Sequence, residues 1–393
     1  MQPGRFRISL RQIIMAIALI GILITLFRSE WDGRPWQKVT AVGFSADGTK
    51  AFAAGMSGRS IISHGRGFEE SITQTVVMFD PNRNDQPIRI DERYHPDRDV
   101  IIGVEPFQFA ALSPDGNRLL IEWLFDAPAD WDVSGKPTLI EQSATVPKHR
   151  VYVCFSDDGQ LTAKVGEPYG AELRRSTTGQ VLLSVSQSSV GFPPAAKFSP
   201  DGQLFAIGNF AGDLCLWQIT PSGVVPKGTY PTGTNLSAFA FSNDGKRLAA
   251  ATGGFVQIWN LADQKRLAGF NLETEWVACT AFLPGDDMLV CGSYDDGLVV
   301  VDVASGKPLP LIAPQLPAAC FAVDAAHGRI LVGDHNGDAT LLDLKTLSPI
   351  RAFHVIHFRA GLPGAFVLLM LVLWSCVAVW MHRRAAARDS AVS

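Results

Sequence analysis

A five-residue motif recurs along the chain at a nearly constant distance. The clearest copy is Phe-Ser-Pro-Asp-Gly at residues 198–202. Close copies end at Gly48, Gly116, Gly159 and Gly245, and divergent copies surround Asp286 and Gly328. Successive turn positions are separated by 68, 43, 43, 43, 41 and 42 residues. A four-stranded propeller blade needs about 40 to 45 residues. Seven copies therefore predict an all-β, seven-bladed β-propeller of four-stranded antiparallel blades.

The residues inside one copy fit this interpretation. An apolar run, 236–241, leads to Asp244-Gly245, where glycine tolerates the positive φ of a tight hairpin turn. Residues 246–252 and 255–259 then read as second and third strands, and the third is rich in β-branched and aromatic residues. Each copy thus predicts consecutive antiparallel strands joined by short turns.

The third predicted strand carries a second signature, 14 or 15 residues after the turn position. Trp131-Asp132 is its clearest form, and related pairs begin at Arg174, Trp217, Trp259, Val301 and Leu342. In the first copy, Phe79-Asp80 lies 31 residues after Gly48, so residues are inserted there. Because WD-repeat strands end in Trp-Asp, the stretch 39–354 resembles the WD-repeat family of β-propellers. This resemblance implies a rigid ring that serves protein interaction.

The chain also departs from that family. No copy has the Gly-His pair that precedes the first WD strand, so we expect the associated Asp-His-Ser-Trp hydrogen-bond network to be missing. TolB-like and YVTN-like propellers also favour Phe-Ser-Pro-Asp-Gly, and they remain alternatives to a WD40 assignment. The repeats are therefore interpreted as degenerate WD40-like or YVTN-like blades.

Both ends of the chain contain apolar segments. Residues 12–27 are uncharged and follow three arginines, so they predict either a secretory signal or a membrane anchor. An Ala-x-Ala-like cleavage site is missing, which favours an uncleaved anchor. Residues 364–381 form an 18-residue apolar run followed by basic residues, which predicts a second span.

The positions of the arginines predict a topology. Because both apolar segments carry them on the terminal side, both termini are expected in the cytoplasm and the propeller on the exoplasmic or periplasmic side of the cell (inner) membrane. The expected organisation is a cytoplasmic tail (1–11), an N-terminal transmembrane anchor (12–27), a linker (28–38), the propeller (39–354), a linker (355–363), a C-terminal transmembrane helix (364–381) and a cytoplasmic tail (382–393).

Insertions point to a candidate interaction surface. Residues 56–71 are expected to form a long loop between the second and third strands of blade 1, and residues 91–105 a loop joining blades 1 and 2. Both should lie on the tethered face beside the turn at 334–338, and loops on a rigid ring often carry binding residues. A solvated loop without a partner is the alternative. The candidate residues, which mix aromatic and charged groups, are Arg59, His64, Arg66, Phe68, Tyr94, His95, Arg98, Asp334 and His335.

Other chemistry has little support in the sequence. No nucleophile elbow, phosphate loop or HExxH motif occurs, so we expect neither catalytic residues nor a cofactor. Residues 334–338 resemble a calcium-binding loop in composition. They lack the length and closing glutamate of an EF-hand, which favours a turn over a metal site. Cys279 and Cys291 are expected on paired strands, either as free thiols or as a disulfide.

Net charge and tethering set the expected partners. A net charge of −4 and an isoelectric point near 6.1 offer no general basic surface for nucleic acid. The favoured function is a membrane-tethered protein-interaction platform with protein partners and no nucleic acid. The alternative is an exoplasmic propeller enzyme or small-ligand-binding protein that uses the central channel.

Overall fold

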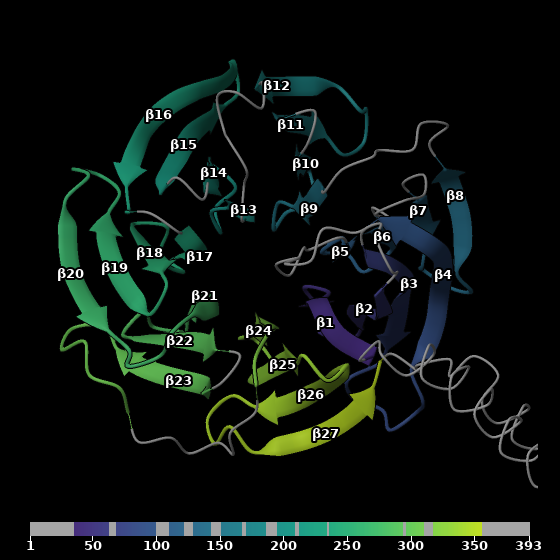
Figure 1. Cartoon of the computed structure of the whole chain (residues 1–393). Helices are drawn as coiled ribbons and strands as arrows, with labels where there is room; N and C mark the ends of the chain where they lie inside the picture. The colour runs from purple at the N-terminus through teal and green to yellow at the C-terminus, as the bar shows by residue number, and fades with distance from the viewer. Residues whose placement is uncertain are drawn as a thin grey trace, which may run out of the picture. The chain divides into compact units, whose positions relative to one another are not determined.

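The described strands form seven antiparallel sheets around a common centre (Figure 1). The computed structural model describes residues 35–62, 68–99, 110–121, 129–142, 151–166, 170–185, 195–208, 212–233, 236–293, 296–309 and 317–355. Consecutive strands pair within each sheet, and the first strand of each lies nearest the centre (Figure 1). The predicted all-β, seven-bladed propeller is confirmed.

Each blade is built from one continuous stretch of chain. Blade 1 contains β1 (Pro35–Phe44), β2 (Ala51–Ile62), β3 (Phe68–Phe79) and β4 (Ile88–Asp99). Blade 2 contains β5 (Ala110–Leu112), β6 (Arg118–Ile121), β7 (Ala129–Asp132) and β8 (Thr138–Gln142). Blade 3 contains β9 (Val151–Phe155), β10 (Leu161–Gly166), β11 (Gly170–Arg175) and β12 (Val181–Val185). Blade 4 contains β13 (Ala195–Phe198), β14 (Leu204–Gly208), β15 (Asp213–Thr220) and β16 (Gly223–Pro231).

The remaining blades follow the same order. Blade 5 contains β17 (Leu236–Phe241), β18 (Arg247–Thr252), β19 (Phe255–Asn260) and β20 (Arg266–Asn271). Blade 6 contains β21 (Val277–Phe282), β22 (Met288–Ser293) and β23 (Gly297–Asp302). Blade 7 contains β24 (Cys320–Asp324), β25 (Arg329–Gly333), β26 (Asp338–Asp343) and β27 (Pro349–His354).

The core lies between neighbouring blades. Six clusters of buried apolar side chains each join two blades, and the cluster around Val39 and Leu331 joins blade 7 to blade 1. In β10 the burial alternates along the strand, as expected when side chains point to opposite faces of a sheet. Stacking of sheet on sheet therefore buries both faces of the inner and middle strands.

The inserted residues of blade 1 lengthen its strands, contrary to the expectation of a loop over 56–71. The β2–β3 register runs without a shift from Ala51 opposite Phe79 to Ile62 opposite Phe68. Because the insert contains no proline, each of its residues within β2 and β3 has an N–H available for the ladder. The expected loop at 91–105 is wrong over its first part in the same way, since β4 continues to Asp99 and passes Pro96 at a register shift.

Blade 6 departs from the four-stranded plan in the part of the chain that is described. Its sheet has three strands, and an isolated bridge between Val301 and Pro308 occupies the place of the fourth. The Leu309 N–H donates to the Val300 carbonyl at 2.8 Å, but Pro308 has no N–H to extend the ladder. Proline thus limits pairing at the rim of this blade.

Among the residues that the structure describes, no helix has the length and apolar character needed to cross a membrane. The predicted spans at 12–27 and 364–381 lie outside those residues, so the two flanking helices stay predictions.

Candidate functional site

The candidate interaction surface falls mainly on the lengthened strands of blade 1. The backbones of Arg59, Phe68, Tyr94, His95 and Arg98 belong to β2, β3 and β4, whereas His64 and Arg66 lie outside the described residues. Arg59 pairs with Ser71 across β2–β3, and His95 pairs with Ile72 across β3–β4. The described parts of the two expected loops instead belong to one extended sheet, which brings these backbone positions together.

Asp334 and His335 occupy the turn between β25 and β26. The Asp334 carboxylate accepts backbone N–H groups of Asn336 and Asp338, both at 2.8 Å, while the His335 side chain is exposed. The Asp334 carbonyl also accepts the Val39 N–H at 2.7 Å, which connects blade 7 to blade 1. Asp334 therefore orders a turn, as the sequence favoured.

Exposed aliphatic side chains recur at one place in the outer strands. In six blades they stand within the first three residues of the outer strand, just after the turn from the third strand, and in blade 6 Leu309 follows the bridge at Pro308; they are 38 to 61% exposed. Single exposed aliphatics are common on protein surfaces, but here they recur in the same region of every blade. We call this set the rim belt: Ile88, Leu139, Ile140, Val181, Val225, Leu267, Leu309 and Ile350. An apolar residue after each third-strand turn was the missed sequence signal.

The recurrent Ser-x-Asp-Gly sequence forms a repeated hydrogen-bonded turn. In blade 5, the Ser242 hydroxyl donates to Asp244 at 2.6 Å and accepts the Arg247 N–H at 2.8 Å, while Asp244 accepts the Lys246 N–H at 2.9 Å. Gly245 has a φ of 68°, as the motif predicts. Side-chain bonds from serine, followed by the backbone bond, lower the pKa of Asp244. The same serine–aspartate bond occurs at Ser45, Ser113, Ser156 and Ser199.

A cation five residues after the turn serine bridges to the next blade. The Lys50 amine donates to the carbonyls of Gly116 at 2.8 Å and Val133 at 2.7 Å in blade 2. Arg247 donates to the carbonyl of Asp286 at 3.0 Å in blade 6. Arg118 in blade 2 contacts the Ser176 carbonyl of blade 3 at 3.2 Å. The sequence contains this recurring cation but gave no sign of its role, which is to connect the turns of neighbouring blades.

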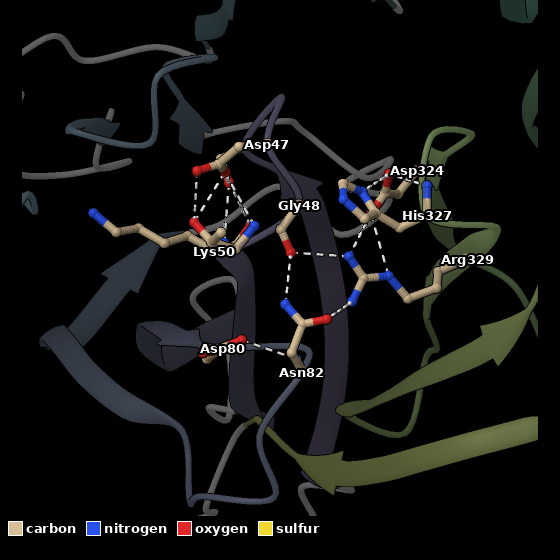
Figure 2. Close-up of polar contacts among 10 residues, drawn as sticks. Asp47, Gly48, Lys50, Asp80, Asn82, Asp324, His327 and Arg329 are labelled. Atoms are coloured by element: carbon tan, nitrogen blue, oxygen red, sulfur yellow. Dashed lines mark hydrogen bonds and ion pairs between the residues drawn. The ribbon is translucent and has the colours of Figure 1, made fainter.

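The same position closes the ring between blades 7 and 1. The Arg329 guanidinium donates to Gly48 at 2.9 Å and Asn82 at 3.0 Å in blade 1, and to Asp324 of its own blade at 2.6 Å (Figure 2). His327 contacts the other Asp324 oxygen at 2.9 Å (Figure 2). Arg329 and Asp324 are both buried, with side chains 8% and 5% exposed. We call the blade 7–blade 1 contact the seam.

Two of the WD-position tryptophans have unsatisfied indole groups. The N–H groups of Trp131 and Trp259 are buried and have no hydrogen-bond partner within the described part of the chain. The Asp-His-Ser-Trp network, which the sequence predicts to be missing, would use an indole N–H of this kind as a donor. The serine–aspartate turns and bridging cations hold these blades together by other polar contacts.

The two cysteines of blade 6 lie on opposite faces of a hairpin. Cys279 pairs with Gly292 and Thr280 pairs with Cys291, following a register shift between Val277 and Cys279. Since neighbouring positions on a strand point to opposite faces, the register separates the two thiols. Both are free, as are Cys154, Cys215 and Cys320.

A cavity of about 430 Å³ lies on the central side of blades 7, 1, 2 and 3. Its walls include turn residues such as Pro114 and Asp157 and inner-strand residues such as Ala111, Cys154 and Ala322. Desolvation and the neighbouring carboxylate of Asp158 raise the pKa of Asp157. The cavity therefore extends from the turns toward the interior of the ring.

Comparison with known families agrees with the fold. Residues 225–260 match the family model "WD domain, G-beta repeat". The match begins in the outer strand β16 of blade 4 and ends with β19 of blade 5, so this repeat spans two blades. Together, the seven blades and this match support a WD-repeat propeller.

Two curated proteins share part of this sequence. Telomerase protein component 1 of Mus musculus is 26% identical over 183 residues, which cover 46% of this chain and 7% of that protein. U3 small nucleolar RNA-associated protein 12 of Saccharomyces cerevisiae is 28% identical over 114 residues, which cover 28% of this chain and 12% of that protein. The matched part thus spans a small share of either relative.

Proposed function

We propose that this chain is a protein-interaction platform, with a WD-repeat-like propeller that presents its rim and the extended sheet of blade 1 to a protein partner. The observation that carries this proposal is the rim belt, because an exposed aliphatic group recurs in the outer part of every blade. Outer strands also leave one backbone edge open, and an extended segment can pair with such an edge. A rigid ring can hold several such contacts at fixed spacing.

The membrane setting is part of the proposal and rests on the sequence. Spans at 12–27 and 364–381 would hold the propeller on the exoplasmic or periplasmic side, with both termini in the cytoplasm. Tethering would raise the effective concentration of the platform toward a membrane-bound or secreted partner.

Crosslinking tests the platform. A photo-reactive residue at Leu267 or Ile350 in the full-length chain should capture one protein in native membranes, and a probe at the turn residue Gln203 should not. A Leu267→Asp change should then weaken capture from Ile350 if one partner spans both blades. Equal capture from the Gln203 probe would contradict the proposal. So would an unchanged yield of capture from Ile350 in the Leu267→Asp protein.

A second crosslinking experiment addresses nucleic acid. The two relatives carry RNA-related or telomerase-related names, whereas the net charge of −4 gives this chain no general basic surface. We therefore expect ultraviolet crosslinking to yield no nucleic acid on the purified protein. Recovery of RNA that depends on the rim residues would replace the protein partner with an RNA.

Protease accessibility tests the membrane setting separately. Protease added to intact spheroplasts should remove the propeller and leave the short terminal segments protected. A protected propeller with accessible tails would reverse the proposed topology without changing the rim-belt argument.

A further inference from the structure

We propose that the cavity on the central side of blades 7, 1, 2 and 3 binds a small quaternary ammonium compound, with Asp157 as its counterion. This site is independent of the rim belt and of the membrane setting.

The cavity has the size and the walls of a small-molecule site. Its volume of about 430 Å³ lies within the range of such sites. Apolar residues from all four blades line it, among them Ala111, Leu112 and Val323. Two residues with phenyl rings, Phe44 and Phe155, also line it, and both are half-buried. An organic molecule in this cavity would therefore contact aliphatic and aromatic surface.

The charge of the cavity wall favours a cation. Among the described residues that line the cavity, the charged side chains are two aspartates. Asp324 is already paired, since Arg329 and His327 contact its two carboxylate oxygens (Figure 2). Asp157 forms no hydrogen bond or ion pair with any residue that the structure describes. It therefore contributes an uncompensated negative charge at the cavity wall.

The turn of blade 5 shows a different use of a polar side chain at this repeat position. Asp157 and Asn243 each follow the turn serine of their blade. The Asn243 amide donates to the Leu283 carbonyl at 2.9 Å and to the Asp286 carboxylate at 2.7 Å, which connects its turn to blade 6. Asp157 forms no such bond to the described part of blade 4. Its side chain is therefore available to a ligand.

The surroundings of Asp157 would stabilise a bound cation. The residue is exposed, so a ligand can reach it from solvent. Desolvation by the surrounding protein, and then the neighbouring carboxylate of Asp158, raise the pKa of Asp157. Both causes disfavour the unpaired anion, and a cation held against the carboxylate would offset both.

The remaining polar groups favour a cation without N–H donors. The hydroxyls of Ser45 and Ser156, which also line the cavity, each donate to the aspartate of their own turn and accept a backbone N–H. A primary ammonium would bring three N–H donors, and buried donors without acceptors are costly. A quaternary ammonium has no such donor, and it can lie against a phenyl ring through a cation–π contact.

Phe155 supplies a ring for that contact. The Phe44 ring, at the same repeat position in blade 1, already lies 5.7 Å from the Arg329 guanidinium. Within the described part of the chain, Phe155 has no contact with a cation or with another ring. It lies two residues before Asp157, and both line the cavity. Carboxylate and ring are thus contributed by one short segment of blade 3.

A charged compound and its neutral analogue test the site. Choline and 3,3-dimethylbutan-1-ol have nearly the same shape, but only choline carries a positive charge. Saturation-transfer NMR on the purified full-length protein measures the dissociation constant of each compound from its methyl signals. We expect choline to bind about five-fold more tightly, which is the effect of a partly solvated ion pair combined with a ring contact.

Three variants locate the site. Asp157→Asn removes the charge at nearly constant size and should weaken choline binding about five-fold, while binding of the alcohol stays the same. Asp263→Asn is the matched control, because that side chain is 48% exposed in a turn of blade 5 and does not line the cavity. Ala322→Leu narrows the cavity and should weaken binding of both compounds several-fold.

Three results would overturn the inference, once circular dichroism has verified that each variant is folded. The first is that choline binds no more tightly than the alcohol, or that neither compound binds. The second is that Asp157→Asn weakens choline binding no more than Asp263→Asn does. The third is that Ala322→Leu leaves the binding of both compounds unchanged, which would place the binding site outside the cavity.

Discussion

The seam and the interface between blades 5 and 6 place an arginine at the same repeat position but surround it differently. Arg247 donates to a turn carbonyl of blade 6 and lies 5.7 Å from the Phe282 ring. Arg329 likewise donates to a turn carbonyl of blade 1 and lies 5.7 Å from the Phe44 ring. The seam adds a buried carboxylate, Asp324, where blade 5 has the turn serine Ser242.

This difference reflects the demands on the two interfaces. Blades 5 and 6 are joined by the chain itself, whereas no covalent link closes blade 7 onto blade 1. The seam gains further contacts near the rim, where Phe79 and Phe353 stack edge to face at 4.6 Å and Arg351 donates to the Arg83 carbonyl at 2.6 Å. Ring closure without an exchanged strand thus depends on side-chain contacts, among them a buried ion pair, together with the backbone bond from Val39 to Asp334.

The largest expected effect separates the two arginines. Arg329→Met leaves the Asp324 carboxylate buried without its main partner, and we expect a loss of about 3–5 kcal/mol in the free energy of unfolding. Arg247→Met removes one hydrogen bond and a ring contact, and it should cost about 1 kcal/mol. Urea unfolding followed by fluorescence measures both. Equal losses would show that Asp324 adds nothing to the seam.

Packing at the seam gives the next effect. A Cβ on Gly333 would lie 2.4 Å from Val39 Cγ1, across the seam, so Gly333→Ala should destabilise the protein by about 1–3 kcal/mol. Gly135→Ala is the matched control, because its Cβ would meet nothing within 4 Å. Thermal unfolding of the two variants checks this. A Gly333→Ala protein as stable as the control would mean that the blades can separate slightly at no cost.

Substitution of the turn serines should give a smaller effect that also distinguishes the seam from blade 5. Ser242→Ala removes the hydroxyl bonds of one turn and should cost about 1 kcal/mol. Ser45→Ala should cost more, because its turn also positions the Gly48 carbonyl that accepts the Arg329 bond across the seam. Chemical unfolding of both variants measures the two losses of stability. A smaller loss for Ser45→Ala than for Ser242→Ala would show that the turn at Ser45 does not support the seam.

Acid sensitivity is the smallest expected effect. Hydrogen bonds from the turn serines lower the pKa values of Asp47, Asp115 and Asp244. Their stabilisation is fully present above the unfolded aspartate pKa of about 3.9 and is lost as pH falls through the lower folded-state values. These carboxylates are largely solvated, so the loss should be modest. Melting temperatures between pH 5 and 2.5 should fall less steeply for Ser242→Ala than for the unaltered protein.

The repeat period fixed most of the fold in advance because a blade is a local structure. Each turn is encoded by a few adjacent residues, as at Ser242 to Gly245, and the glycine conformations agree with that reading. The insert in blade 1 was misread because its length gave no sign that it would continue a ladder. Within the described residues of blade 6, Pro308 cannot donate an N–H, and the pairing after β23 is limited to a bridge.

The candidate sites were harder to predict because they join distant residues. The seam joins Arg329 to Gly48 across 281 positions. The rim belt was present in the sequence, but its apolar residues resemble ordinary strand residues until their exposure is known.

The self-contained blades also bear on the order of folding. When the N-terminal and C-terminal strands of a propeller share one sheet, that sheet cannot be completed until the C-terminal strand has been synthesised. Here blade 1 has all of its strands once Asp99 has been made, and each later blade adds to a finished neighbour. Synthesis from the N-terminus can therefore assemble the propeller blade by blade, and the seam is the final contact to form.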